Sequence, residues 1–268
     1  GQYLSCNYRI ILGSRSEYKP PKWLSSAETV LIDWYSEESL RHACFEVDII
    51  IHASGMNAQE CAADPEQALL VNGIFTDKLI QASIKQGVRQ FLYLSSAHVY
   101  GSNLSGIINE KSLTDNLHPY ATSHRYGENA LLMAIKKRVI DGFVVRLSNA
   151  FGAPAHKNVN CWMLLVSDLC KQAVTKNTLT LTSNGQQQRD FLTISDVCSS
   201  LAYLIEHRNE SDTNIVNIGS GKGFTVYEMA VRIQANCVRA FGFRPKITQG
   251  KSIRVKKQNK LVFQANYL

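Results

Sequence analysis

The sequence contains no run of eighteen apolar residues, although 45% of its 268 residues are hydrophobic. A transmembrane helix needs about twenty such residues in a row, so we expect neither a membrane span nor a membrane partner. The first residues, Gly1–Ser5, also lack the basic segment and apolar core of a signal peptide. With 19% charged residues, the composition is that of a soluble chain long enough for one large domain or two smaller ones.

Paired cysteines are missing as well. The chain has 7 cysteines, an odd number, and none are spaced as C-x-x-C. This scatter argues against a disulfide framework and against a zinc site, so no metal is expected. Unpaired cysteines fit a reducing, cytoplasmic location.

Acidic residues are absent from residues 244–260, where much of the net charge of +7 is concentrated. Such a basic stretch is typical of a solvated face, of a wall that contacts a phosphorylated small molecule, or of a nucleic-acid surface. The stretch has no interleaved aromatic residues, so a solvated face is favoured and no nucleic-acid partner is expected.

What the sequence does contain is an alternation of apolar runs and helical patterns. The runs predict strands at 8–12, 29–32, 47–52, 91–94, 143–147 and 215–219, and the helical patterns predict helices at 65–86, 120–137, 159–174 and 226–238. The apolar runs do not alternate with polar residues, which predicts a parallel sheet covered on both faces. Ligands of such sheets bind beyond the carboxyl ends of the strands.

Two residues with hydroxyl groups stand out, one at the end of a predicted strand and one at the start of a predicted helix. Ser96 closes the strand that begins at Phe91, and Tyr120 opens a helix further along the chain. A phenol whose pKa is shifted by its neighbours acts as a general acid or base in enzymes. The alternative for Ser96 is a serine that caps backbone groups at the end of the strand.

Seven short segments together resemble one known family. They are Ile51–Gly55, Val71–Gly73, Ser95–Gly101, Pro119–Ser123, Arg146–Gly152, Gly185–Phe191 and Asn217–Gly221. In this order they resemble the extended short-chain dehydrogenase/reductases, specifically the NAD-dependent epimerase/dehydratase family, which acts on nucleotide sugars. The resemblance covers nearly the whole chain.

The resemblance implies an α/β fold: a Rossmann-type doubly wound parallel sheet with a small C-terminal α/β substrate-binding domain. The dinucleotide-binding domain is expected over residues 1–150 plus about 193–219. The substrate-binding domain is expected over 151–192 and 220–268.

The resemblance also implies catalytic roles. Tyr120 corresponds to the family's proton-transferring tyrosine, and Ser96 to the serine that binds the reacting sugar oxygen. His124 stands where the family has a lysine, which holds the nicotinamide ribose and lowers the pKa of the tyrosine. Histidine is shorter and mostly neutral at pH 7. We therefore expect either a slower enzyme with a higher pH optimum or a site whose chemistry has been lost.

The implied cofactor is NAD or NADP. The resemblance assigns the dinucleotide to the residues Gly1, Ser14, Arg15, Asp33, Ala53, Ser54, Gly55, Asn72, Tyr120 and His124. An acidic residue that selects NAD is missing after the first apolar run. Ser14 and Arg15 stand there instead and would suit the 2′-phosphate of NADP, although Arg15 could equally be solvated.

The implied substrate is a nucleotide-diphosphate sugar. The residues assigned to it are Ser96, His98, Asn149, Arg189 and, near the C-terminal end, Arg254 and Lys256, between which the pattern does not choose. An arginine fork suits a phosphate. His98 could act as a base or have only a structural role. The Asp-Glu pair of the sugar dehydratases is absent at positions 97 and 98, which argues against a dehydratase.

One part of the family pattern is missing. The sequence has no G-x-x-G-x-x-G turn, whose backbone N–H groups meet the pyrophosphate. Gly1 could be its last glycine, so we interpret the chain as a fragment or as a product with a damaged front end. A sheet without its central first strand would expose unpaired edges.

The leading hypothesis is therefore a nucleotide-sugar epimerase that acts through NAD(P). The alternatives are a keto-sugar reductase and a non-catalytic member that binds a nucleotide sugar or a partner protein. The resemblance also implies a homodimer formed through two long helices, one of which carries Tyr120.

Overall fold

The computed structural model describes residues 1–17, 19–155, 159–207, 213–250 and 259–266. At its centre lies a parallel sheet with the strand order β10-β6-β4-β3. Its strands are β3 (Ile49–His52), β4 (Gln90–Ser96), β6 (Asp141–Leu147) and β10 (Ile215–Ile218). The register places Ser96 beside Leu147, so the ends of β4 and β6 meet at one edge of the sheet.

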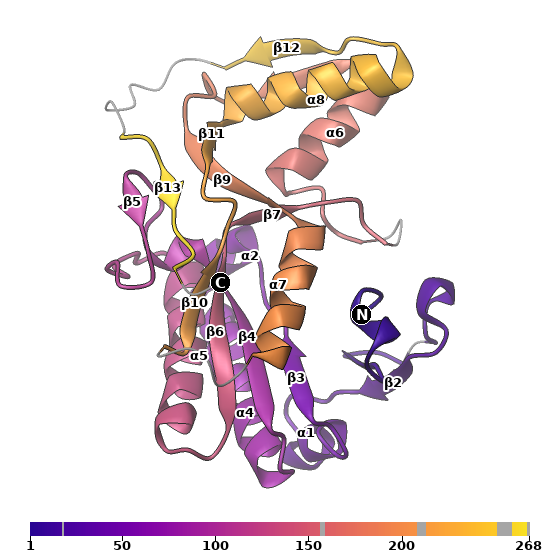
Figure 1. Ribbon diagram of the computed structural model, residues 1–268, viewed down its shortest axis with the longest axis vertical. Coiled ribbons are helices and arrows are strands. Elements are labelled where there is room, and N and C mark those ends of the chain that lie inside the picture. The colour runs from indigo at the N-terminus through magenta and orange to yellow at the C-terminus, as the bar shows by residue number, and fades with distance from the viewer. Residues whose placement is uncertain (18, 156–158, 208–212, 251–258, 267–268) are drawn as a thin grey trace.

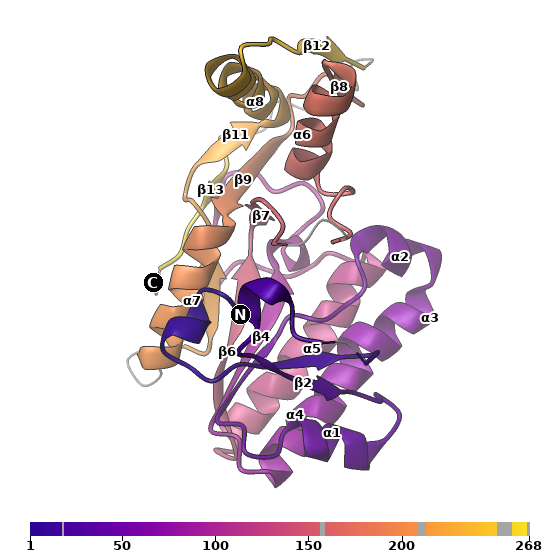
Figure 2. The same cartoon turned by 90° about the vertical axis from the view of Figure 1, so that its right-hand side faces the viewer.

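Helices cover both faces of this sheet (Figure 2). On one side lie α1 (Glu37–Ala43), α4 (Phe75–Lys85) and α5 (Pro119–Lys136), and on the other lies α7 (Ile194–Glu206). Phe91 and Tyr93 of β4 pack towards α4 and α5, whereas Leu92 between them packs towards α7. Both faces of β4 are therefore apolar, which explains the unbroken apolar run and confirms the predicted α/β fold.

The N-terminal part of the sheet is separate. Strands β1 (Ile11–Ser14) and β2 (Glu28–Leu31) form their own parallel pair, and Figure 1 shows β2 on the β3 side of the main sheet. Short 3₁₀ helices at Leu4–Cys6 and Lys22–Leu24 flank β1. No described strand pairs with the second edge of β1 or of β3. The predicted sheet is thus divided, and the strand expected over 8–12 begins only at Ile11.

The long helix predicted over 65–86 is interrupted. After α2 (Ala58–Ala63), the chain forms α3 (Pro65–Ala68), a π-helical turn (Leu69–Ile74) and then α4. The π-helical turn carries Asn72, whose side chain is almost completely buried. Such turns often accompany functional sites because they redirect one side chain.

The C-terminal region lies beyond the carboxyl ends of β4 and β6, at the top of Figure 1. It has its own core between α6 (Leu165–Lys176) and α8 (Val226–Phe241). Its strands are β7 (Asn149–Phe151), β8 (Thr178–Leu181), β9 (Gln188–Thr193), β11 (Gly223–Thr225), β12 (Lys246–Gln249) and the pair β5 (Ile107–Ile108) and β13 (Val262–Phe263). Within the described ranges, no helix is long and apolar enough to cross a membrane.

Candidate active site

The first component of the site is the turn that follows β4. Ser96 ends the strand, and its Oγ accepts a hydrogen bond from the backbone N–H of His98 (3.2 Å). This bond starts the short 3₁₀ helix Ala97–Val99. The capping role that the sequence left open for Ser96 is therefore present, and the serine is buried next to the start of α5.

Tyr120 reaches Ser96 from the first turn of α5. The helix begins after His118, whose Nδ1 accepts from the N–H of Tyr120 (3.2 Å), and Pro119 follows at the first helical position. Burial raises the pKa of the Tyr120 phenol; a side-chain hydrogen bond with Ser96 opposes this rise, and the nearby thiol of Cys61 adds to it. The structure thus brings Ser96 and Tyr120 together, but with a phenol that holds its proton more firmly than usual.

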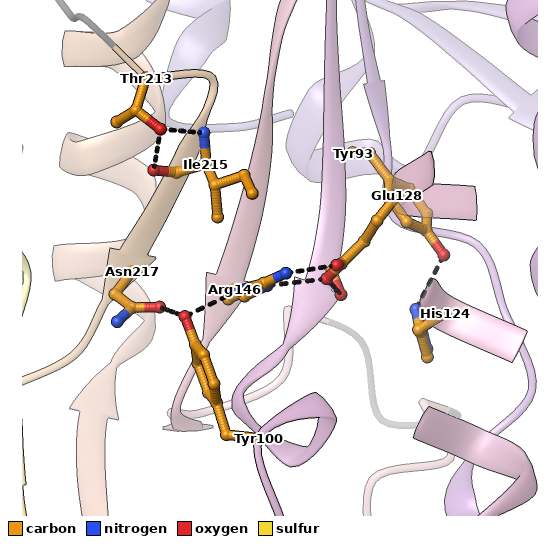
Figure 3. Close-up of polar contacts among 9 residues, drawn as sticks. Tyr93, Tyr100, His124, Glu128, Arg146, Thr213, Ile215 and Asn217 are labelled. Atoms are coloured by element: carbon orange, nitrogen blue, oxygen red, sulfur yellow. Dashed lines mark hydrogen bonds and ion pairs between the residues drawn. The ribbon is translucent and has the colours of Figure 1, made fainter. Parts of the chain in front are cut away.

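His124 lies one helical turn beyond Tyr120, and the two ring centroids are 4.5 Å apart. Its Nδ1 is 2.8 Å from the hydroxyl of Tyr93, as Figure 3 shows. Burial lowers the pKa of His124 to about 3, and the neighbouring His52 and His98 add to the effect. His124 is therefore neutral near pH 7 and supplies no positive charge that could lower the pKa of Tyr120.

Asn72 connects the end of β3 to α5. Its Oδ1 accepts from the N–H of Met56 (2.7 Å), and its Nδ2 donates to Ser123 Oγ (3.1 Å). A Cβ on Gly55 would lie 2.9 Å from that same Oδ1, so the loop packs tightly against Asn72. The amide of Asn72 is thus engaged in holding the loop.

Three of the residues predicted to bind substrate line one pocket beside this site. His98, Asn149 and Arg189 share it with Ser148 and Gln187. Burial lowers the pKa of Arg189, and no carboxylate pairs with it among the described residues. An unpaired, mostly buried guanidinium favours an anionic ligand.

Two neighbours of these residues differ in the hydrogen bonds that their side chains make. Asp190 accepts from the N–H (2.8 Å) and Oγ (2.9 Å) of Ser220, and its carbonyl accepts from Asn149 Nδ2 (2.9 Å). Ser148 Oγ is the one enclosed side-chain polar atom without a hydrogen-bond partner in the described part of the chain. In the sequence, Ser148 appeared only as part of the segment Arg146–Gly152.

The remaining predicted cofactor residues lie in the separate N-terminal part. Ser14 Oγ accepts from the N–H of Ser16, and Asp33 Oδ1 accepts from the N–H of Tyr35. Arg15 is exposed, and the carbonyl of Gly1 accepts from the N–H of Ser5. None of the interactions among described residues links this group to Tyr120 or His124. The predicted residues Arg254 and Lys256 lie outside the described residues.

Part of the dinucleotide fits the residues present. Ala53, Ser54 and Gly55 are exposed at the carboxyl end of β3. Together with Tyr120 and His124 they offer backbone groups, a phenol and an imidazole, a donor set that suits a ribose hydroxyl. The cation of the family pattern is replaced by a neutral ring, and the sequence has no glycine-rich turn for the pyrophosphate.

Sequence reasoning missed two residues that shape this site. Tyr93 contacts His124. Glu128 accepts a hydrogen bond from the hydroxyl of Ser95 (2.5 Å), the residue before Ser96. The spacing of Tyr120, His124 and Glu128, four residues apart on one helix, could have pointed to Glu128.

The comparisons with known proteins agree on a family. The model of the NAD dependent epimerase/dehydratase family matches residues 2–219. A putative UDP-glucose 4-epimerase of Methanocaldococcus jannaschii is 24% identical over 186 residues, which are 69% of this chain and 59% of that protein. UDP-glucuronic acid decarboxylase 1 of Danio rerio is 28% identical over 197 residues, 71% of this chain and 45% of the relative.

The chain spans about half the length of these curated relatives. Among solved structures, the UDP-glucose 4-epimerase of Thermus thermophilus in complex with NAD superimposes with a TM-score of 0.77. It is 18% identical, and the match covers 98% of this chain and 84% of that one. At this identity the likeness establishes the shared fold.

Proposed function

We propose that this chain, which belongs to the NAD dependent epimerase/dehydratase family, acts on a nucleotide-diphosphate sugar as an NAD(P)-dependent epimerase. The observation that carries the proposal is the pocket of His98, Asn149 and Arg189 beside the Ser96–Tyr120 pair. An anion-binding wall next to a phenol and a hydroxyl suits a substrate that joins a diphosphate to a sugar alcohol.

In this proposal Arg189 and Asn149 bind the diphosphate, and Ser96 holds the sugar hydroxyl. Tyr120 removes the proton from that hydroxyl and returns it at the end of the reaction. The bound dinucleotide supplies the hydride acceptor. His124 holds a ribose hydroxyl of the dinucleotide, and the exposed backbone of Ala53–Gly55 lines its binding place.

The proposal keeps the predicted domain division: residues 1–150 plus about 193–219 for the cofactor, and 151–192 plus 220–268 for the substrate. The exposed Arg15 leaves NADP open beside NAD. A homodimer through the long helices is also proposed; exposed apolar side chains on α5, Tyr126 (43%) and Met133 (59%), support it.

One observation favours a second function, a non-catalytic nucleotide-sugar-binding protein. His124 is buried and neutral, and the pKa of Tyr120 is raised by its burial. A phenol without a nearby cation is a poor base at neutral pH. The residues of the substrate pocket do not need a cation beside Tyr120, so a nucleotide sugar can bind there without being converted.

The test is to measure binding and turnover together in the full-length protein. NAD and NADP are titrated by calorimetry, and UDP-, GDP- and dTDP-sugars are screened for binding and for product. Epimerised product whose formation is lost in Tyr120→Phe supports the epimerase, whereas product formed only from a keto-sugar with reduced cofactor identifies a reductase.

The matched control is Tyr203→Phe, which removes the hydroxyl of an exposed tyrosine on α7 and should leave turnover unchanged. A sugar nucleotide that binds without any product identifies the non-catalytic protein. A folded protein that binds neither a sugar nucleotide nor a dinucleotide contradicts both proposals.

A further inference from the structure

A chain of buried hydrogen bonds leads from His52 to His124. His52 Nε2 lies 3.0 Å from Thr76 Oγ1, which donates to the carbonyl of Asn72 (2.8 Å). The hydroxyl of Tyr93 donates to the same carbonyl (3.2 Å) and lies 2.8 Å from His124 Nδ1. All five residues are buried, so each proton in the chain has to be shared among protein atoms.

Counting protons gives the direction of each bond. A carbonyl oxygen only accepts, and a hydroxyl has a single proton. When Thr76 and Tyr93 both donate to the carbonyl of Asn72, their oxygens accept from the two imidazoles. In the reverse arrangement Tyr93 would donate to His124, and the carbonyl of Asn72 would keep the proton from Thr76. The Tyr93 oxygen and that carbonyl would then lie 3.2 Å apart with no proton between them, so one buried hydrogen bond would be lost.

We propose that Tyr93 is a positioning residue that holds His124 as the Nδ1–H tautomer, so that its Nε2 is a neutral hydrogen-bond acceptor for a ligand hydroxyl. Nε2 has no hydrogen-bond partner among the described residues. It is also not enclosed and unpaired, a state that, within the described ranges, the side-chain atom Ser148 Oγ alone shows. We place the ligand hydroxyl at this nitrogen. Tyr120 packs edge-on against the ring of His124, so the ligand hydroxyl lies beside the phenol.

The inference rests on the proposed function for the identity of the ligand, a ribose hydroxyl of the dinucleotide. A lysine at this position would donate a hydrogen bond to the ribose hydroxyl, because an ammonium only donates. Nε2 of His124 accepts one instead. The ribose hydroxyl then donates its proton to the protein, and the protein supplies orientation without charge. Figure 3 shows the imidazole directed at Tyr93, the contact on which this assignment depends.

The experiment is a tautomer measurement by NMR on the chain labelled with ¹⁵N-histidine at pH 7. Correlations between the ring nitrogens and the ring carbon protons distinguish Nδ1–H from Nε2–H, and the signals of His124 are assigned by their loss in His124→Gln. We expect Nδ1–H in the wild type and a shift towards Nε2–H in Tyr93→Phe. The matched control is Tyr100→Phe, which removes another buried tyrosine hydroxyl that does not contact His124.

A wild-type His124 with its proton on Nε2, or a Tyr93→Phe variant with an unchanged tautomer, overturns the inference. The wild-type spectrum decides even if Tyr93→Phe does not fold. Titration with NAD is a separate arm, in which we expect the Nε2 signal to shift more than the Nδ1 signal. If neither NAD nor NADP binds, the proposed function is contradicted, and the tautomer is decided by the spectrum without ligand.

Discussion

Two regions of the inner face of α5 treat a buried ionisable side chain in opposite ways. One turn separates His124 from Glu128, and both are more than 90% buried. Glu128 accepts from Nε (3.0 Å) and from a terminal nitrogen (2.6 Å) of Arg146, so it is charged and paired. His124 has the Tyr93 hydroxyl at Nδ1 and the Tyr120 ring beside it, and it is neutral because burial lowers its pKa.

These two residues differ in what lies opposite them, because Glu128 has an opposite charge beside it and His124 does not. Burial lowers the pKa of Arg146. The hydrogen bonds to Glu128 and the attraction between the two charges outweigh burial, so the pKa of Arg146 is raised overall. The pair is neutral as a whole. The helix face that carries Tyr120 therefore presents no net charge to the candidate active site.

The charged region also connects distant parts of the chain. Arg146 donates to the hydroxyl of Tyr100 (3.0 Å), which donates to Asn217 Oδ1 (2.8 Å). Asn217 Nδ2 in turn donates to the carbonyl of Gln264 (2.9 Å). Figure 3 shows the first members of this row running from α5 across β6 to β10. The pair thus joins the site helix, the sheet and the C-terminal segment.

The largest expected effect comes from breaking the charged region with Arg146→Met. Glu128 would remain buried without its partner, and such a loss destabilises proteins by about 3–5 kcal/mol. The free energy of unfolding, measured in urea, should fall by that amount. The control is Arg89→Met, which breaks the exposed pair with Asp48 and should change stability by less than about 1 kcal/mol. Equal losses in the two variants would refute the contrast between buried and exposed pairs.

The second way to break the comparison is to give the neutral region a charge with His124→Lys. An ammonium beside a phenol lowers its pKa by about 1–3 units. If the chain is an enzyme that needs the Tyr120 phenolate, its kcat rises with pH as the phenol loses its proton. In His124→Lys this rise should occur at least about one pH unit lower, which makes the variant about tenfold faster than the wild type at pH 7. The control His124→Gln stays neutral and should leave the position of the rise unchanged. A lysine variant with the wild-type pH profile would show that Tyr120 does not limit the rate.

The third prediction concerns acid. The pKa values of His52 and His124 are lowered by burial to about 4 and about 3, and both groups titrate near 6.5 in the unfolded chain. Below pH 6.5 the unfolded state binds more protons, so each histidine reduces stability by about 1.4 kcal/mol per pH unit as the pH falls towards its folded pKa. Unfolding measured at pH 7, 6 and 5 should show this slope, and His124→Asn should reduce it.

His42 provides the comparison for that experiment, because it is exposed on α1. The His42→Gln variant should keep the wild-type dependence on pH. If His124→Asn keeps it as well, then His124 is not a neutral buried histidine.

The smallest expected effect concerns Ser148. It adds a third case to the comparison of Glu128 and His124, because its hydroxyl is a buried polar group without a partner in the part of the chain that the structure describes. Ser148 Oγ has none among the described residues, and an unsatisfied buried group costs about 1–3 kcal/mol. The Ser148→Ala variant should therefore be as stable as the wild type or slightly more so. Lower stability would mean that the hydroxyl has a partner in solution.

The pattern of the sequence predicted the parallel sheet, its helices and the meeting of Ser96 with the start of α5. Apolar runs such as Phe91–Leu94 and the helical pattern that begins at Tyr120 are local signals, and the strand ends of a parallel sheet meet at one edge by geometry. The pocket that joins His98, Asn149 and Arg189 was expected only through a resemblance to a family. The sequence analysis expected unpaired strand edges but did not predict that the sheet would be divided beside β3.

The state of each buried ionisable group was decided by the tertiary structure. The same helix pattern places both His124 and Glu128 inward, and nothing in their spacing distinguishes a neutral side chain from a charged one. The choice depends on what the neighbouring strands bring opposite them: Tyr93 from β4 to the histidine and Arg146 from β6 to the glutamate. Charge is set by desolvation and by partners, which are distant in sequence and come together only in the folded chain.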